Sequence, residues 1–312
     1  MIQINILVHN SDRFIFTKKS LNYLMGIKDC NKLKIKINIS YSDIKQKTFW
    51  EELIDEFKLS GFFISLSFYP YTNKNNYLNK INSFLETACE YSCSMDDDIM
   101  LSTELWDYMI DNINILDDED NLFLAPIISN GIPSIELFIN DFCDEDFTEK
   151  MHNLFINTNI PNLWGANYEH LNVDRDVWDM DYFESVKKIN HHYKGIHPIR
   201  ISVTGQEMVA NYVCDNFDNF LSKNDYYLEK FKYPYFCNSF YFIKTSVWKK
   251  IIEDKSLFRD PYDEVPLNIY RESNDLNMVF VRNGFCLHMA YNTIGPDEQK
   301  RIEDIYKKRL LK

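Results

Sequence analysis

The sequence of 312 residues predicts an α/β protein built on a mixed, mostly parallel sheet that is flanked by helices. Two observations lead to this prediction. In the first third of the chain, segments whose apolar side chains alternate along the sequence are followed by segments with helical spacing. This β-α-β-α order favours parallel strands with covering helices. The second half is less regular, although it contains further short apolar strands and ends in a charged helix.

The elements of the first third follow from the spacing of apolar residues. In the clearest strand, Leu33, Ile35, Ile37 and Ile39 alternate strictly with polar residues. The predicted strands are 2–8, 33–39, 62–68 and 91–95, and the predicted helices are 16–25, 50–57 and 78–88.

Capping and turn residues delimit the later elements. Thr204 and Glu207 have the spacing of a capping box, and Thr245 is a plausible helix N-cap. Asn283-Gly284 predicts a hairpin between two apolar runs. The later strands are expected at 122–129 (ending at the turn Asn130-Gly131), 239–244, 277–281 and 285–291, and the last helix begins at Pro296.

The composition excludes several classes of protein. The formal net charge of −13 disfavours global attraction to nucleic acid or to anionic membranes. Seven cysteines without a CxxC pair give no zinc spacing or disulfide framework, so reduced thiols in a cytoplasmic protein are the simplest expectation. The first residues have the pattern of a strand rather than a signal peptide, and no run of about 18 apolar residues occurs.

Three adjacent carboxylates, Asp96, Asp97 and Asp98, follow the strand at 91–95. Their mutual repulsion is relieved by solvent or by a cation, and hard divalent ions prefer oxygen ligands. A turn after the strand would direct Asp96 and Asp98 to the same side. A solvated acidic loop is the alternative for an isolated triplet, but the position between an apolar strand and a helix favours a metal site.

Other sites for phosphates or metals fit the sequence less well. A dehalogenase-type phosphatase motif would need Thr or Val where Met100 stands, and a calcium loop would need further acidic ligands in register. No GxGxxG or GxxxxGK[ST] pattern occurs among only 8 glycines, which disfavours Rossmann-type cofactor sites and P-loops.

The segment CEYSCSMDDD, residues 89–98, resembles the DxD region of glycosyltransferases with the GT-A fold, family 2-like members in particular. KINSFLETA, from Lys80, resembles the helix that carries a basic residue toward the donor, although the family usually has Arg-Asn where this chain has Lys80-Ile81-Asn82. DPYDEVPLNIYRE resembles the region of the catalytic carboxylate, and GFCLHMAYN resembles the region of a C-terminal metal-binding histidine. LAPIISNG and CNSFYFIKTSVW resemble further strand and acceptor-side regions, the second without the expected glycine. The resemblance covers about residues 1–131 and 235–292.

The resemblance implies a single GT-A-like domain over residues 1–312. Residues 1–131 would form the nucleotide-sugar-binding half, 132–292 the acceptor-side half, and 293–312 a C-terminal helix. The implied activity is metal-dependent transfer of a hexosyl or pentosyl group from a nucleoside diphosphate sugar, UDP-sugar first, to an acceptor hydroxyl, with inversion favoured over retention.

Each implied role falls on a matching position of this chain. Mn²⁺ or Mg²⁺ would be held by Asp96, Asp98 and His288, and would neutralise the charge on the leaving diphosphate. Glu264, or else Asp263, would take the proton of the acceptor hydroxyl. The expected donor-binding residues are His9, Asp43, Lys80 and Asp97. Two of these, His9 and Asp43, follow predicted strands, where ligands bind in parallel sheets.

The acceptor is open. Residues 185–206 contain no Asp or Glu. Their basic residues are expected either to contact donor phosphates or an anionic acceptor, or to form an exposed basic loop. These residues are Lys187, Lys188, Lys194 and Arg200. A glycan or a lipid-linked saccharide is the expected acceptor, and hydroxymethylated bases of phage DNA are the alternative. A degenerate GT-A domain that binds a carbohydrate or a partner without turnover is the non-enzymatic alternative.

Overall fold

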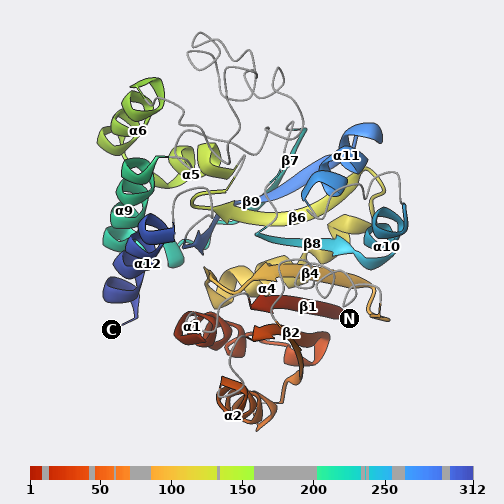
Figure 1. The fold of residues 1–312 in the computed structure, drawn as a ribbon. Coiled ribbons are helices and arrows are strands. Elements are labelled where there is room, and N and C mark those ends of the chain that lie inside the picture. The colour runs from red at the N-terminus through yellow and green to blue at the C-terminus, as the bar shows by residue number, and fades with distance from the viewer. Residues whose placement is uncertain are drawn as a thin grey trace.

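A computed structural model of the chain describes most of the sequence (Figure 1). The described residues are 1–8, 14–41, 46–59, 61–70, 86–131, 134–157, 202–232, 236, 239–254, 264–289 and 296–311.

The centre of the described structure is a nine-stranded mixed sheet with strand order β3-β2-β1-β4-β8-β6-β9-β5, in which β7 also pairs with β9. The first four strands of this order are parallel to one another, and so are β6 and β9. The remaining pairings are antiparallel. The strands are β1 (Ile2–Val8), β2 (Leu33–Tyr41), β3 (Phe63–Pro70), β4 (Tyr91–Asp96), β5 (Ile99–Leu101), β6 (Asn121–Ile128), β7 (Tyr227–Phe231), β8 (Phe240–Lys244) and β9 (Asn277–His288).

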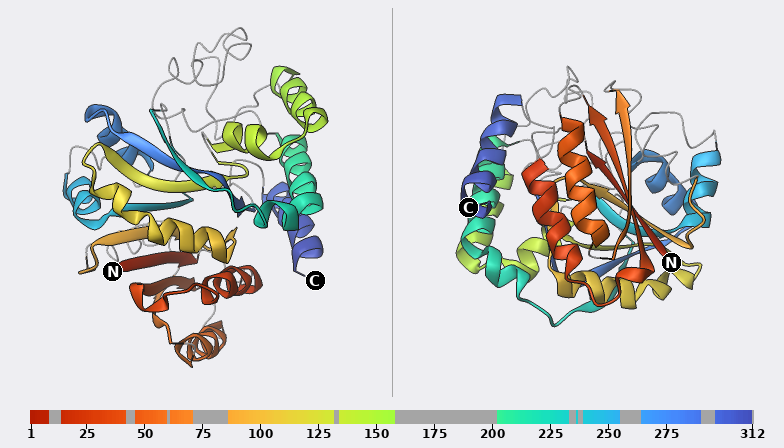
Figure 2. Two further views of the ribbon diagram at one scale, coloured as in Figure 1. Left: turned by 180° about the vertical axis from the view of Figure 1, so that it is seen from behind. Right: turned by 90° about the horizontal axis from the view of Figure 1, so that it is seen from below.

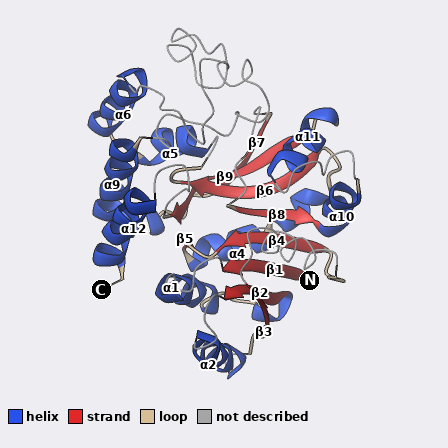
Figure 3. Cartoon of the chain, in the orientation of Figure 1, coloured by secondary structure: helices blue, strands red, loops and turns tan. Residues whose placement is uncertain are grey.

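Helices flank this sheet (Figure 3). Figure 2 shows α1 and α2 on the same face of the β1–β3 region, and α12 packs along α9. The described helices are α1 (Phe14–Met25), α2 (Gln46–Leu59), α4 (Thr103–Asp111), α5 (Ser134–Phe142), α6 (Glu145–Asn157), α9 (Val203–Leu221), α10 (Thr245–Glu253), α11 (Glu264–Ser273) and α12 (Pro296–Leu310), with 3-10 turns at Cys30–Lys32 and Ile113–Asp117. The predicted α/β class with a mixed sheet and flanking helices is confirmed.

Strand β6 shows how the sheet separates two hydrophobic cores. All eight of its residues are buried. Leu124 and Ile128 belong to a core shared with α1, α2 and α4, whereas Phe123 and Ile127 belong to a second core shared with α5, α9 and α12. Because successive side chains of a strand point to opposite faces, a strand that is covered on both sides becomes continuously apolar. This explains why residues 122–128 form an unbroken apolar run.

The strand directions bring several chain segments to one edge of the sheet. Strands β1, β4, β6 and β9 all run the same way, because β8 is antiparallel to both β4 and β6, and β6 is parallel to β9. Their carboxyl ends therefore lie at a common edge. Strand β5 follows β4 after only the turn Asp97-Asp98, yet it pairs with β9 at the far end of the strand order. The sheet consequently curls, and the end of β4 meets the end of β9.

Most of the predicted strands and helices are confirmed, but the hairpin at Asn283-Gly284 is wrong. Strand β9 continues through this dipeptide, and its pairing with β6 jumps from Val281 to Phe285. Asn283 has a φ of 59°, so the dipeptide forms a bulge. Both flanking runs pair with β6 in the same direction, which excludes a chain reversal.

Two predicted helix caps are also wrong. The N-cap of α9 is Ser202, whose hydroxyl accepts a hydrogen bond from the Gly205 amide, so Thr204 lies inside the first turn. Thr245 is the first residue of α10 rather than its cap, and its hydroxyl bonds to Ser92 of β4 instead. The helix expected at 78–88 lies largely outside the described residues, and its last residue, Ala88, is not helical.

Among the described residues, no helix is long and apolar enough to cross a membrane.

Candidate functional site

The turn between β4 and β5 carries the acidic triplet. Asp96 is the last residue of β4, and Asp97 and Asp98 form the turn that leads into β5. In the pairing of β5 with β9, Ile99 lies opposite His288. The strand register thus places Asp98 beside His288, although 190 residues separate them in the sequence.

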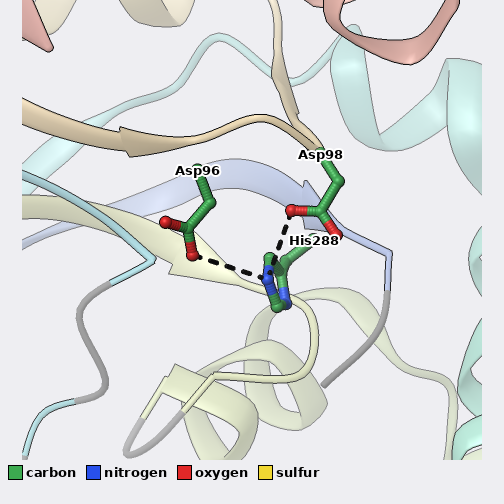
Figure 4. Close-up of side chains that lie close together, drawn as sticks. All are labelled: Asp96, Asp98 and His288. Atoms are coloured by element: carbon green, nitrogen blue, oxygen red, sulfur yellow. Dashed lines mark ion pairs between the residues drawn. The ribbon is translucent and has the colours of Figure 1, made fainter. Parts of the chain in front are cut away.

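Asp96, Asp98 and His288 form a compact cluster, in which one ligand atom from each lies within 4.8 Å of the others. His288 Nε2 is 3.4 Å from Asp98 Oδ1 and 3.9 Å from Asp96 Oδ2. Figure 4 shows both carboxylates facing the imidazole ring. The side chains of Asp98 and His288 are 1% and 5% exposed, whereas that of Asp96 is 24% exposed. The cluster is therefore anchored inside the protein and accessible from the side of Asp96.

Helix α1 holds the acidic turn through two hydroxyl groups. Thr17 donates a hydrogen bond to the Asp97 carbonyl oxygen over 3.0 Å, and Ser20 donates one to the Ile99 carbonyl. Thr17 and Ser20 are three residues apart, so they lie on the same face of the helix. Both are buried. The backbone on either side of Asp98 is thereby fixed to α1.

His288 is held by the loop that follows β6. Ser129 donates its backbone N–H to the Cys286 carbonyl over 3.0 Å, which extends the pairing of β6 with β9 by one residue. The next side chain, Asn130, contacts His288 twice. Its Nδ2 donates to the His288 carbonyl over 2.9 Å, and its Oδ1 lies 3.0 Å from His288 Nδ1. The ring atom Nε2 is then the one that faces the carboxylates.

Burial and the nearby Asp98 raise the pKa of neighbouring groups on two elements. Burial raises the pKa of the Cys286 thiol on β9 well above its usual value, and the nearby Asp98 adds to this. Burial likewise raises the pKa of the Tyr306 hydroxyl on α12, with smaller contributions from Cys214 and Asp98. Both groups therefore stay protonated and neutral, and they add no further negative charge beside Asp98.

The ligand atoms of these three side chains are spaced suitably for a hard divalent cation. An octahedral ion at about 2.1 Å from its ligands separates neighbouring ligand atoms by about 3.0 Å and opposite ones by about 4.2 Å. The separations of 3.4 and 3.9 Å lie within that range. Two carboxylate oxygens and one imidazole nitrogen also leave positions for substrate oxygens or water.

The cluster lies where an α/β sheet binds ligands. Strand β1 pairs with β2 on one side and β4 on the other, and Asp96 lies opposite Leu7 near the end of β1. The chain continues from β1 to β2 and then β3 on one side, and β4 lies on the other side, so the strand order reverses direction at β1. Ligands of open α/β sheets bind at such a point, outside the carboxyl ends of the strands.

The structure brings three of the predicted site residues together, namely Asp96, Asp98 and His288. Asp97 is buried between them in the turn, and its role in donor binding stays a prediction. Glu264 is the first residue of α11, and its side chain is outside the described part. The other predicted site residues lie outside the described residues: His9, Asp43, Lys80, Lys187, Lys188, Lys194, Arg200 and Asp263.

The sequence interpretation missed Thr17, Ser20 and Asn130. The first two are single hydroxyls in an amphipathic helix, and nothing local distinguishes them from surface residues. Asn130 was read as half of a turn signal. Its position directly after a strand that ends at the common edge of the sheet was the available clue.

No protein-family model matches the sequence, and no curated protein matches it. Among solved structures, the chain is similar to residues 1–349 of TarS from S. aureus, with a TM-score of 0.35, 10% sequence identity, and coverage of 70% of this chain and 72% of that chain. The structure of the same TarS fragment in complex with UDP gives a TM-score of 0.35, 9% identity and the same coverage. Similarity at this level assigns no activity.

Proposed function

We propose that the chain is a metal-dependent glycosyltransferase of the GT-A type, which transfers a sugar from a nucleoside diphosphate sugar to an acceptor hydroxyl. The observation that carries the proposal is the cluster of Asp96, Asp98 and His288 at the carboxyl ends of β4 and β9. Two carboxylates beside one imidazole, spaced at 3.4 and 3.9 Å from it, suit a divalent cation. The chemistry of such a site fits a diphosphate substrate.

The proposed donor lies at the edge of the sheet between β1 and β4. The partly exposed Asp96 faces that edge, and the buried Asp98 and His288 lie behind it. His9, Asp43 and Lys80 remain the proposed contacts to the nucleotide, since His9 directly follows β1 and Asp43 comes two residues after β2. UDP-sugars are the first donors to test.

Mn²⁺ is the proposed ion, with Mg²⁺ second. Carboxylates suit both ions, but an imidazole ligand is less suited to Mg²⁺, which also gives up its water reluctantly. When bound, the ion supplies positive charge to the diphosphate oxygens as the glycosidic bond breaks. The turn that carries Asp96 and Asp98 would position the ion, and α1 fixes this turn through the hydrogen bonds of Thr17 and Ser20.

A carboxylate at the start of α11 is the proposed base. Glu264 is preferred and Asp263 is second. The base removes the proton from the acceptor hydroxyl while that oxygen attacks the anomeric carbon from the side opposite to the diphosphate. A direct displacement of this kind inverts the anomeric configuration.

A thermal-shift panel tests the donor site. The melting temperature of the chain is measured with UDP, GDP, CDP and their sugar conjugates, each with and without Mn²⁺. Ligands that bind only the folded state raise the apparent stability, by about 2.7 kcal/mol at a ligand concentration of 100 Kd. We expect one nucleotide to give a shift that requires Mn²⁺.

Asp96→Asn and Glu119→Gln provide the matched comparison. Asp96 is the most exposed member of the cluster, so removing its charge carries the least risk to folding. Glu119 is an exposed carboxylate in the turn before β6. The nucleotide shift should disappear in Asp96→Asn and persist in Glu119→Gln. If no nucleotide shifts the wild-type chain, the proposal fails and a non-catalytic GT-A-like binding domain takes its place.

A second pair of variants tests the base. Glu264→Gln should keep the metal-dependent nucleotide shift but lose hydrolysis or transfer of the bound sugar. Glu272→Gln, on the same helix, should keep both. Transfer by Glu264→Gln at the wild-type rate would move the role to Asp263, and Asp263→Asn would then be the inactive variant.

The acceptor proposal is a glycan or a lipid-linked saccharide, with hydroxymethylated DNA as the alternative. The basic residues between Lys187 and Arg200 are the proposed contacts to an anionic acceptor. Once the donor is known, the release of the nucleoside diphosphate in the presence of each acceptor class separates these two choices.

A further inference from the structure

The two hydrogen bonds between Asn130 and His288 determine which ring nitrogen of the histidine carries the proton. Both side chains are buried. Asn130 Nδ2 lies 2.9 Å from the His288 carbonyl oxygen, which can only accept, so this end of the amide is its NH₂ group. The other end, Oδ1, can only accept, and it lies 3.0 Å from His288 Nδ1.

The proton of the neutral imidazole therefore resides on Nδ1. In that tautomer Nε2 carries a lone pair and no hydrogen. Nε2 is the atom that lies 3.4 Å from Asp98 and 3.9 Å from Asp96. A lone pair directed at two carboxylates is the arrangement that a cation between them requires.

We infer that Asn130 is a positioning residue, which fixes the Nδ1–H tautomer of His288 and so makes Nε2 a metal ligand. Without this acceptor the proton can move to Nε2, from where it would point at Asp98 and occupy the direction that a cation needs. The inference rests on the proposed metal site for its purpose. The tautomer itself can be observed without metal or substrate.

The local backbone explains why Asn130 is in reach. Gly131 donates its N–H to the Ile128 carbonyl over 3.2 Å, which closes a tight turn directly after β6. A Cβ on residue 131 would lie 2.6 Å from Ser134 Oγ and 3.0 Å from Ile128 Cβ, so a larger residue would crowd both side chains. The turn leaves Asn130 at the end of β6 next to the end of β9.

Nitrogen-15 NMR of the metal-free chain tests the inference directly. Histidine labelled with ¹⁵N at both ring positions gives a different pattern of long-range proton couplings for each tautomer. At pH 8 the wild-type signal of His288, assigned by its absence in His288→Gln, should show the proton on Nδ1. In Asn130→Ala it should move toward Nε2, and in Asn130→Asp it should stay on Nδ1, because a carboxylate still accepts.

Mn²⁺ affinity measured by calorimetry on the same variants tests the consequence. Loss of an outer hydrogen-bond partner of a metal ligand typically weakens metal binding by about 10–100-fold. We expect this loss in Asn130→Ala and a change of only a few-fold in Asn130→Asp. Asn112→Ala is the control, because Asn112 also donates its side-chain N–H to a backbone carbonyl, that of Tyr108 in α4, and should leave the affinity unchanged.

The outcomes separate this inference from the proposed function. A wild-type ring protonated on Nε2, or an unchanged tautomer in Asn130→Ala, overturns the inference. So does a result in which Asn130→Ala changes the tautomer but binds Mn²⁺ as tightly as the wild type. If the wild-type chain shows the Nδ1–H tautomer but binds no Mn²⁺, the metal site fails and so does the role of Asn130 in it. Equal losses of Mn²⁺ affinity in Asn130→Ala and Asn130→Asp would also overturn the inference. They would show that Asn130 acts only through its hydrogen bond to the His288 carbonyl.

Discussion

Strand β9 takes part in two charged clusters, six residues apart, that differ in the distances between their charged atoms. Arg282, at the bulge, donates from Nε to Asp141 over 2.8 Å, and its two terminal nitrogens bond to Asp141 and Glu229. His288, at the end of the strand, faces two carboxylates at 3.4 and 3.9 Å. A charge-assisted hydrogen bond measures about 2.7–2.9 Å.

The difference indicates the role of each cluster. The guanidinium donates three hydrogen bonds to the two carboxylates. These bonds fix β7 and α5 to β9. These bonds also raise the pKa of Arg282, led by the bond to Asp141. The cluster at His288 holds its oxygen and nitrogen atoms apart, at the spacing of ligands around an ion. We expect the matched cluster to stabilise the fold and the spaced cluster to bind a cation.

The largest expected effect comes from Asp98→Asn. This change keeps the shape of the side chain but removes a buried charge, so metal binding should fall by about 100-fold or more, since ligand charge dominates the affinity for hard ions. Stability without metal should change little, because an amide of the same shape costs less to bury than a carboxylate. Calorimetry with Mn²⁺ and thermal melting without metal measure the two effects.

Asp107→Asn is the matched control for this prediction. The Asp107 side chain is also largely buried, and it accepts a hydrogen bond from the Lys28 amide over 3.0 Å. We expect this variant to lose stability and keep its Mn²⁺ affinity. A marked loss of metal-free stability in Asp98→Asn with retained Mn²⁺ binding would place Asp98 with the matched cluster.

Arg282→Met should have the opposite profile. It leaves Asp141, whose side chain is 6% exposed, without its cation, and breaking a buried pair in this way costs about 3 kcal/mol. The midpoint of urea unfolding should fall clearly while Mn²⁺ affinity stays the same. In the control Arg309→Met, the lost partner is the exposed Asp215, and the midpoint should move much less. Equal shifts for the two arginines would contradict the distinction between the buried and exposed pairs.

The sequence was sufficient for the strands but not for the bulge between these clusters. Alternation of apolar residues located β1 and β2, because this period of two is a local feature of the sequence. Asn283-Gly284 has the signature of a hairpin turn, and its positive φ is real. Whether such a dipeptide reverses the chain or bulges it depends on the pairing partner, β6, which lies more than 150 residues earlier.

The candidate site shows the same limit. The acidic triplet is visible in the sequence, but His288 came only from the resemblance to GT-A enzymes, since no spacing rule joins residues that are 190 positions apart. Strand order brings them together, through β5 and β9. The groups that support them, Thr17, Ser20 and Asn130, belong to elements whose place beside the turn is set by the whole sheet.

A smaller effect is expected when the support from α1 is removed. Thr17→Val and Ser20→Ala each leave a buried carbonyl without its donor, which costs about 1–3 kcal/mol. Both variants should also weaken Mn²⁺ binding a few-fold, because the turn that carries Asp98 loosens. Thr103→Val removes a similar bond, from Thr103 to the Tyr23 carbonyl, away from the turn. It should lower the melting temperature without changing the Mn²⁺ affinity, and equal affinities in all three variants would show that the turn needs no support.

The smallest effect is expected from an exposed version of the matched cluster. Lys244 and Tyr91 both hydrogen-bond to Asp117, and the bond from Lys244, followed by that from Tyr91, holds the pKa of this carboxyl below its ordinary value of 3.8. A lowered pKa stabilises the fold at every pH above the ordinary value, and this contribution is lost only as the pH falls through the lower pKa of the folded state. The melting temperature of Asp117→Asn should therefore lie slightly below that of the wild type, by the same small amount at pH 7 and 5, and by less than in Arg282→Met. A difference that disappears already between pH 7 and pH 5 would mean that another group is responsible, and one as large as for Arg282→Met would mean that burial does not distinguish the two clusters.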